Sequence, residues 1–423
     1  MESDPVKRRK FSAGRRARWA AMIAILPLFA AACSSASSTG SGASAAGTAS
    51  GSADSSGSPL RIYAVAGETG AAAPVSPLLL AGLRAAVSMI NAKGGILGRK
   101  VELTVANDQS DPTQAVSLVE SQLTGGNPPD LVYAGTGSAE NLAVSGVTNA
   151  AKVFTLAVGS SNVLGNAAEF PYTFTVNSSA STEAGSTAQY LKSKGYKNIG
   201  LISSDDAAGI SSATAYETAL KQAGLNLVDA ESYPDTAIDM SPELERINSH
   251  HPDAVVVEGV NWGAYLMQSR VKAGMGNVPF VSDSATQAVD YSAALTAAEK
   301  QGVTMQVNTV NVDTTTSPGK TALLNALNKA GVKLVEPLYV YAVSSDVLLS
   351  YANAAIAVHS TDPAKVKAEL ETGNVPETFP TALAPKFNWT PTLHLVTQGG
   401  LYEFIPVDQI GRASCRERVC MLV

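Results

Sequence analysis

The sequence predicts an α/β protein with parallel sheets, organised as two lobes of similar size. Short apolar segments typical of buried strands alternate with longer segments of helical periodicity, and such alternation favours parallel sheets with right-handed crossovers. The pattern begins at residue 60 and starts again near residue 182. The chain has 423 residues, enough for two domains with hydrophobic cores. A single large sheet is the alternative arrangement.

The first half of the chain contains four predicted strands, at residues 60–65, 101–106, 131–134 and 153–158. The helices between them begin at residues that favour a helix start. A serine–proline pair at 76–77 opens the first helix and an aspartate–proline pair at 111–112 opens the second. Glycine pairs at 94–95 and 125–126 end these helices, and a third helix begins at Ser138.

The second half repeats this alternation. Strands are predicted at 198–203, 225–228, 254–257, 279–282 and 301–312. Helices are predicted at about 182–194, 212–223, 241–249 and 263–273, followed by a long amphipathic helix at 344–358.

The first 32 residues have the composition of a secretion signal rather than of a folded element. A basic segment precedes an apolar run at 19–32, which is too short to span a membrane comfortably. The alanines at 30–32 followed by Cys33 resemble a bacterial lipobox, in which the cysteine receives a lipid. The match departs from that motif in having alanine, not leucine, at position 30. A plain secretory signal is the alternative.

Residues 33–58 consist almost entirely of Ser, Gly, Ala and Thr. Such a segment cannot bury enough apolar surface to fold, so we expect a flexible tether. A lipid on Cys33, a tether and then a folded body predict an extracytoplasmic protein anchored to the cell membrane. Stable anchoring of this kind requires two acyl chains.

Residues 410–423 resemble the translation of a sequencing adapter, and we interpret them as an artefact. Two of the three cysteines lie there, which leaves Cys33 as the one native cysteine and excludes a disulfide framework. Without this run and the leader, the chain has 20 basic and 33 acidic residues, a net charge of about −13. An acidic body argues against nucleic acid as a partner.

One stretch, at 130–144, combines a buried strand, a glycine turn and a helix start at Ser138. In open α/β sheets, ligands settle beyond the carboxyl ends of the strands, where free N–H groups and the positive end of a helix favour anions. The Ser138 hydroxyl adds a further polar group, so we expect a ligand carboxylate here. The alternative is that Ser138 is an ordinary helix N-cap, worth about 1 kcal/mol.

Four segments resemble the branched-chain amino-acid-binding proteins, the type I periplasmic receptors of ABC importers. They are AGLRAAVSMINAKGGILGRKVELTVANDQSDPTQAV, YAGTGSAENLAV, YLKSKGYKNIGLISSD and PDAVVVEGVNWGAYLMQSRVKAG. The resemblance implies two lobes joined by three hinge strands, which close on a ligand by hinge motion. It implies one lobe from 59–177 with 309–386 and the other from 178–308 with 387–409.

The resemblance also implies which residues of the first lobe hold the ligand carboxylate. They are Ser138 and Ala139 at the helix start, with the turn formed by Gly159, Ser160 and Ser161. Hydroxyls and two sets of backbone amides can hold an anion without a buried positive charge. The alternative for Ser160 and Ser161 is a pair of loop hydroxyls that make local turn bonds.

The second lobe departs from the family pattern. Ala208 stands where an aromatic residue is frequent, and Thr175 stands where arginine is frequent. These departures weigh against leucine-type specificity and leave amide, urea-like or other amino-acid-like ligands open. The acidic residue that takes the ligand ammonium falls on or near Asp283, with a surface-loop aspartate as the alternative. Glu258, at the end of a strand, could serve instead, and Trp262 could form a wall of the pocket.

Sequence signals for other chemistry are missing. The turn at 135–138 lacks the third glycine of a nucleotide fingerprint, and no G-x-S-x-G elbow or nucleophile–base pair is evident. The adjacent histidines at 250–251 lie in a predicted loop without further ligands at metal spacing, so we expect solvated histidines rather than zinc ligands. We therefore predict no cofactor, no metal site and no enzymatic activity.

The sequence thus predicts an extracytoplasmic solute-binding lipoprotein. It would capture a small polar ligand, such as an amino acid, an amide or a urea-like molecule, between its lobes. It would deliver this ligand to the permease and ATPase subunits of an ABC importer. A ligand-sensing receptor domain for a signalling partner is one alternative, and a secreted α/β hydrolase is a weaker one.

Overall fold

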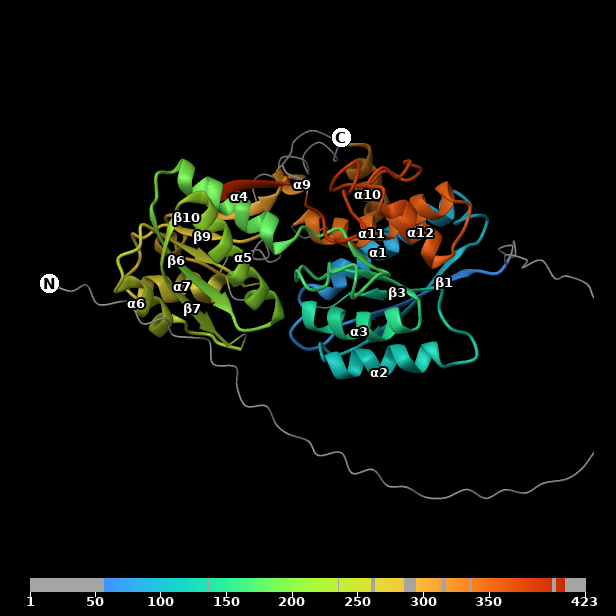
Figure 1. The fold of residues 1–423 in the computed structure, drawn as a ribbon, viewed down its shortest axis with the longest axis horizontal. Coiled ribbons are helices and arrows are strands. Elements are labelled where there is room, and N and C mark those ends of the chain that lie inside the picture. Colours follow the sequence, from blue (N-terminus) through green and yellow to red (C-terminus); the bar gives the residue numbers. More distant parts are fainter. Residues whose placement is uncertain are drawn as a thin grey trace, which may run out of the picture. The chain divides into compact units, whose positions relative to one another are not determined.

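The computed structural model describes residues 57–135, 137–234, 236–259, 263–284, 294–312, 317–334, 337–397 and 401–407. These residues belong to one compact unit of the chain. They contain two separate sheets, each with helices on both faces (Figure 1). The predicted pair of doubly wound α/β lobes is therefore confirmed, and the single large sheet is excluded. The leader, Cys33 and the tail at 410–423 lie outside the described residues.

The first sheet is entirely parallel, with strand order β2-β1-β3-β4-β5. Its strands are β1 (Leu60–Ala66), β2 (Val101–Asn107), β3 (Leu131–Ala134), β4 (Phe154–Ala157) and β5 (Thr173–Thr175). Side chains alternate between the two faces, as the pleat of a strand requires. Along β1, Ile62 packs with the largest core cluster, whereas Tyr63 and Val65 pack on the opposite face.

Helices cover both faces of this sheet, with α1 and α11 on one side and α2 and α3 on the other (Figure 1). The helices of this lobe are α1 (Ser76–Ala92), α2 (Pro112–Leu123), α3 (Ser138–Ala150), α10 (Pro318–Lys329), α11 (Leu338–Ala357) and α12 (Pro363–Leu370). Helix α11 is long and apolar enough to cross a membrane, but 89% of its apolar window is buried. It is a core helix rather than the amphipathic helix that we expected from residue 344, because neighbours surround it on all sides.

Two predicted helix starts have different outcomes. Asp111 caps α2, since its Oδ1 accepts hydrogen bonds from the amides of Thr113 at 2.7 Å and Gln114 at 3.1 Å. The serine–proline pair at 76–77 does open α1, but the N-cap position is Val75 and Ser76 lies inside the helix. The Ser76 side chain is fully buried and does not cap the helix.

The second sheet has the order β11-β10-β9-β8-β6-β7, and its neighbours are parallel except for the antiparallel pair β10 and β11. Its strands are β6 (Asn198–Ser204), β7 (Asn226–Tyr233), β8 (Ala254–Val257), β9 (Phe280–Ser282), β10 (Val303–Asn308) and β11 (Tyr402–Pro406). The helices of this half of the chain are α4 (Ala180–Ser193), α5 (Ala207–Ala223), α6 (Ser241–Asn248), α7 (Gly263–Lys272), α8 (Ala297–Lys300) and α9 (Thr309–Val312). Helices α4 and α5 share one core with the sheet, and α6 and α7 share another.

Within the described residues, the chain passes between the lobes after β5, after β10 and before β11. The strand predicted to run to residue 312 ends at Asn308, because the Asn308 side chain accepts the amide of Val310 and starts the short helix α9. Phe387 and Trp389 pack in the first-lobe core, although the sequence assigned residues from 387 onward to the second lobe. We therefore propose that the last crossing lies between Val396 and β11.

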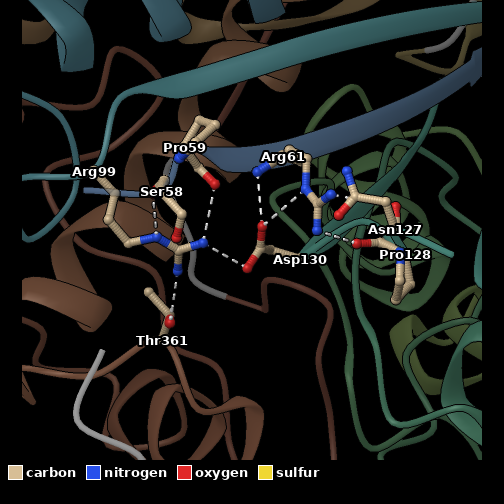
Figure 2. A network of polar contacts seen from close by, with 8 residues as sticks. All are labelled: Ser58, Pro59, Arg61, Arg99, Asn127, Pro128, Asp130 and Thr361. Carbon is tan, nitrogen blue, oxygen red and sulfur yellow. Dashed lines mark hydrogen bonds and ion pairs between the residues drawn. The ribbon is translucent and has the colours of Figure 1, made fainter. Parts of the chain in front are cut away.

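A polar network ties the amino ends of the first-lobe strands together (Figure 2). The guanidinium of Arg99, which is 8% exposed, pairs with Asp130 at 2.8 Å and donates to the carbonyls of Ser58 and Pro59. Asp130 also accepts the amide of Arg61 at 2.8 Å. The arginine of the GGILGRK segment therefore fixes the first described residues onto the sheet.

Candidate ligand-binding cleft

A cavity of about 320 Å³ lies between residues of the two sheets. Its wall includes residues that directly follow β3 and β4 in the first lobe and β8 and β9 in the second, together with the last residue of β6. These are the carboxyl ends of parallel strands, where ligands bind in open α/β sheets. The volume lies within the range of about 300–1,000 Å³ that is typical of small-molecule sites.

Ser138 holds the two first-lobe turns together. It is the first residue of α3, and the N-cap is Gly137, so the interpretation of Ser138 as an ordinary N-cap is wrong. The Ser138 hydroxyl oxygen instead accepts the backbone amides of Ser160 and Ser161, each at 3.3 Å. Both contacts are long, and Ser138, Ala139 and Ser160 line the cavity.

Asn141 accepts hydrogen bonds from backbone amides in the turn that we expected to hold the ligand carboxylate. Its Oδ1 accepts the amides of Val158 at 2.9 Å and Gly159 at 3.0 Å, while its Nδ2 donates to the carbonyl of Gly137 at 2.8 Å. Gly159 lines the cavity, but its amide is already used by Asn141. Ser161 is only 2% exposed and lies behind the cavity wall. The donors that face the cavity are thus fewer than the sequence suggested.

Glu140 adds a carboxyl group that sequence reasoning missed. The residue lies in the first turn of α3, is 8% exposed and lines the cavity. Burial raises its pKa, and the nearby carboxyl groups of Asp108 and Asp206 raise it further. Its position two residues after Ser138 was visible in the sequence, but an acidic residue in a first helical turn is also an ordinary partner of the helix dipole.

Glu258 is the central acidic group of the second-lobe wall. It follows β8, is 2% exposed, and its Oε2 accepts the Ser204 hydroxyl at 3.1 Å and the Ser204 amide at 3.3 Å. Burial raises the pKa of Glu258 well above its usual range, and the charges of Asp206 and Glu183 add to this shift. A carboxyl group in such a position gains stability when a cation arrives.

Asp283 follows β9 and also lines the cavity. It is 3% exposed, so the interpretation as a surface-loop aspartate is wrong. Its amide donates to the carbonyl of Val257 at 3.0 Å, which places it beside the end of β8 and thus beside Glu258. The two acidic positions that the sequence offered as alternatives therefore stand next to each other.

Residues at the crossings between the lobes complete the wall, and sequence reasoning missed them. Oε1 of Glu183 on α4 accepts the hydroxyls of Tyr402 at 2.8 Å and Ser284 at 2.9 Å. Tyr339, at the start of α11, donates its hydroxyl to Asn177. Glutamate and tyrosine inside helices carry no sequence signal of their own, because only the fold brings them to the cavity.

The remaining predicted positions have separate outcomes. Ala208 lines the cavity, as its place in the family pattern implied. Thr175 lies inside β5, where its carbonyl accepts the Trp389 indole at 2.8 Å, and it is absent from the described cavity wall. Trp262 lies outside the described residues.

A two-lobed α/β fold with a cavity between the carboxyl ends of its two sheets is typical of proteins that bind a small molecule in the cleft between their lobes. The family model of the periplasmic binding proteins matches residues 59–404, so the chain belongs to that family. It has the fold of the type I periplasmic binding proteins.

Several known proteins are similar to this chain. A Leu/Ile/Val-binding protein homolog from Brucella abortus is 30% identical over 217 residues, which are 46% of this chain and 53% of that protein. The chain therefore spans about half the length of the curated relatives that it matches.

Solved structures share the fold at lower identity. A type 1 periplasmic binding protein from Bordetella pertussis has a TM-score of 0.72 at 19% identity, covering 82% of this chain and 96% of that chain. A leucine-binding protein from Thermotoga maritima has a TM-score of 0.69 at 15% identity, covering 82% and 97%. A solute-binding protein from Rhodopseudomonas palustris in complex with p-hydroxybenzoic acid has a TM-score of 0.62 at 20% identity, covering 74% and 85%.

Proposed function

We propose that this protein is an extracytoplasmic solute-binding lipoprotein of an ABC importer. It captures a small amino-acid-like or amide ligand between its lobes and presents the closed form to permease and ATPase subunits. No bond is made or broken. The family to which the chain belongs supports a small organic solute, as do a similar leucine-binding protein and a similar solute-binding protein in complex with p-hydroxybenzoic acid.

The observation that carries this proposal is the cavity whose wall comes from both lobes. Ser138 and Ser160 contribute hydroxyl groups from one lobe, while Glu258 and Asp283 contribute carboxyl groups from the other. A ligand that contacts both walls stabilises the closed arrangement by its differential contacts with that state. We propose Ser138, Ala139, Gly159, Ser160, Glu258 and Asp283 as ligand-contacting residues, with Ser161 behind them.

A thermal-shift screen tests capture directly. The panel contains amino acids, amides, urea, diamines, aromatic acids and sugars, each added to the purified protein. A true ligand at about 100 times its Kd adds about 2.7 kcal/mol of apparent stability and raises the melting temperature. A panel in which no compound shifts the melting temperature would overturn the proposal.

A cavity-filling variant localises the effect. Ala139→Phe places a large ring at an exposed residue of the cavity wall, so we expect the ligand-dependent shift to disappear while the ligand-free melting temperature stays unchanged. Ala150→Phe, at the exposed far end of the same helix, is the matched control and should keep the shift. A full ligand shift in Ala139→Phe would place the ligand elsewhere.

Membrane anchoring rests on Cys33 and the tether at 33–58, as the sequence resemblance to a lipobox suggests. In a lipoprotein-processing bacterial host, we expect mass spectrometry to find a diacylglyceryl-modified cysteine at position 33 and the protein to sediment with membranes. Cys33→Ser should release it to the soluble fraction. Equal membrane association of Cys33→Ser and the parent chain would argue against a lipid anchor.

A further inference from the structure

The cavity wall is acidic. Its carboxyl groups belong to Glu140, Glu183, Asp206, Glu258 and Asp283, and the described residues that line it include no Lys, Arg or His. The undescribed internal segments cannot supply a basic side chain either, because none of their residues is Lys, Arg or His. These segments are 136, 235, 260–262, 285–293, 313–316, 335–336 and 398–400.

Glu183, Asp206 and Glu258 accept hydrogen bonds from hydroxyls and backbone amides. Asp206 accepts the Ser204 hydroxyl at 3.0 Å and the Gly209 amide at 2.7 Å. By contrast, Asp130 at the other end of the first sheet pairs with the guanidinium of Arg99 at 2.8 Å. Among the ion pairs of the described residues, none involves Glu140, Glu183, Asp206 or Glu258.

The carboxyl groups of the two lobes act on one another. Asp206 raises the pKa of Glu140 in the first lobe and of Glu258 in the second, which places it electrostatically between them. Like charges close together repel one another, and water screens this repulsion less in a buried site than at the surface. A positive group in the cavity relieves both the mutual repulsion and the burial penalty, whereas a negative group adds to them.

We propose that the cleft selects an aliphatic organic ligand of net positive charge, a diamine or a basic amino acid, over neutral and anionic ligands of similar size. This inference rests on the proposed function, because it names the ligand class of the same cavity. The apolar part of the wall, with Leu79, Val158 and Val340, provides a surface for the methylene chain. Carboxyl groups on both lobes let one cation at each end of the ligand draw the lobes together.

Neutral zwitterions and metal ions fit these features less well. A zwitterionic amino acid brings one cation and one anion, and its carboxylate at the start of α3 meets the carboxyl group of Glu140. A second cationic nitrogen on the ligand offsets the repulsion between the ligand carboxylate and the carboxyl group of Glu140. Among the residues described, no group of three or more His, Cys, Asp or Glu side chains is arranged to hold a metal ion.

Isothermal titration calorimetry on the purified protein tests charge selection with near-isosteric pairs. Lysine is compared with norleucine, which has a hydrogen in place of the terminal ammonium, and cadaverine is compared with pentanol. We expect lysine or cadaverine to bind at least about a hundredfold more tightly than its neutral counterpart, and the difference to shrink as salt is raised. Neutral or anionic ligands that bind as tightly as the cations would overturn charge selection while leaving solute capture intact. A protein that binds no member of the broader thermal-shift panel would overturn both.

Two conservative variants locate the charges. Asp206→Asn removes a negative charge but keeps a favoured N-cap for α5, and Glu258→Gln keeps an acceptor for Ser204. Each should weaken lysine by about tenfold and norleucine by less, because lysine carries one ammonium more than norleucine. Glu120→Gln on the exposed face of α2 is the matched control and should change neither. Both cleft variants should still unfold cooperatively. If they then bind the cation as tightly as the control does, the proposal is contradicted.

Discussion

Ser138 shows how a residue's role depends on partners that lie far away in the sequence. As the first residue of α3, it does not cap the helix, and its hydroxyl oxygen instead accepts hydrogen bonds from two amides of the turn after β4, each at 3.3 Å. Long hydrogen bonds of this kind are easily exchanged for shorter, charge-assisted bonds to a ligand carboxylate. The Ser138 hydroxyl can thus hold the turn after β4 in place and also contact a ligand.

Ser138→Ala should therefore distinguish ligands that carry a carboxylate from those that do not. We expect lysine binding to weaken by about tenfold, the loss of one charge-assisted hydrogen bond, and cadaverine binding to stay the same. Calorimetric Kd values check this. Ser145→Ala, a buried serine on the same helix away from the cavity, is the control. Unchanged lysine affinity in Ser138→Ala would exclude a carboxylate contact there.

Asp346 is a buried acid outside the cavity. It lies on α11 with no exposed surface, and its Oδ2 accepts the amide of Leu383 at 2.7 Å. Burial raises its pKa from 3.8 to about 7. The folded chain therefore holds a proton that the unfolded chain releases above about pH 4, so this residue's contribution to stability is lost as the pH rises from about 4 to 7.

Asp346→Asn should remove this pH dependence. We expect the free energy of unfolding, measured with urea between about pH 4 and 8, to fall with pH more steeply in the parent chain than in the variant. The difference should reach a few kcal/mol, since each pKa unit is worth about 1.4 kcal/mol. Other acidic groups titrate in both proteins and cancel in the comparison. Parallel pH profiles would show that Asp346 keeps its ordinary pKa.

Helix packing in the first lobe depends on a glycine that the sequence did not single out. Gly82 on α1 approaches α11 so closely that a Cβ there would lie 2.0 Å from the carbonyl oxygen of Tyr341. A contact of this kind cannot be relieved by moving a flexible side chain, because the neighbour is backbone. The two helices that cover one face of the first sheet are therefore held together at this point.

Gly82→Ala should separate α1 from α11 and lower the unfolding free energy by about 1–3 kcal/mol, the usual effect of overpacking. Thermal and urea unfolding measure this loss. Gly146→Ala on the exposed side of α3, where a Cβ meets nothing within 4 Å, is the control and should stabilise the chain by about 0.5–1 kcal/mol. Equal stability in both variants would show that α11 shifts freely.

At the scale of elements, strands were predicted well where local patterns were strong. The runs at 131–134 and 254–257 coincide with β3 and β8, because four buried apolar residues between polar turns leave few alternatives. Helix α5 begins at Ala207 rather than near residue 212, since Asp206 accepts the amide of Gly209 and caps the helix earlier. Start positions of this kind depend on single side-chain hydrogen bonds.

At the scale of the whole molecule, the crossings between the lobes carry polar contacts that also belong to the cavity. The Tyr402 hydroxyl contacts Ser178 and donates to Glu183, so β11, the crossing after β5 and the cavity wall are linked. A ligand that bridges the two walls therefore acts on the segments about which the lobes would move.

Ligand binding should therefore compact the protein. We expect small-angle X-ray scattering to give a smaller radius of gyration with a saturating cationic ligand than without it, because contacts to both walls favour the closed state. Glu258→Gln should need a higher ligand concentration for the same change, and Ala139→Phe should show no change. A radius of gyration that stays constant at saturation would mean that binding does not close the lobes.

The sequence by itself determined the α/β class, the two lobes and the neighbourhood of Ser138, since these depend on periodicity and on turn residues close in the chain. The family was indicated by the resemblance of four segments to known proteins. Only the tertiary structure decided that Asn141 accepts the hydrogen bond of the Gly159 amide. It also decided that Asp283 is buried beside Glu258 and that Glu140 and Glu183 line the same cavity. The physical reason is that electrostatic and hydrogen-bond partners in a cleft come from strands far apart in the chain. Their distances are set by the packing of the sheets rather than by spacing along the sequence.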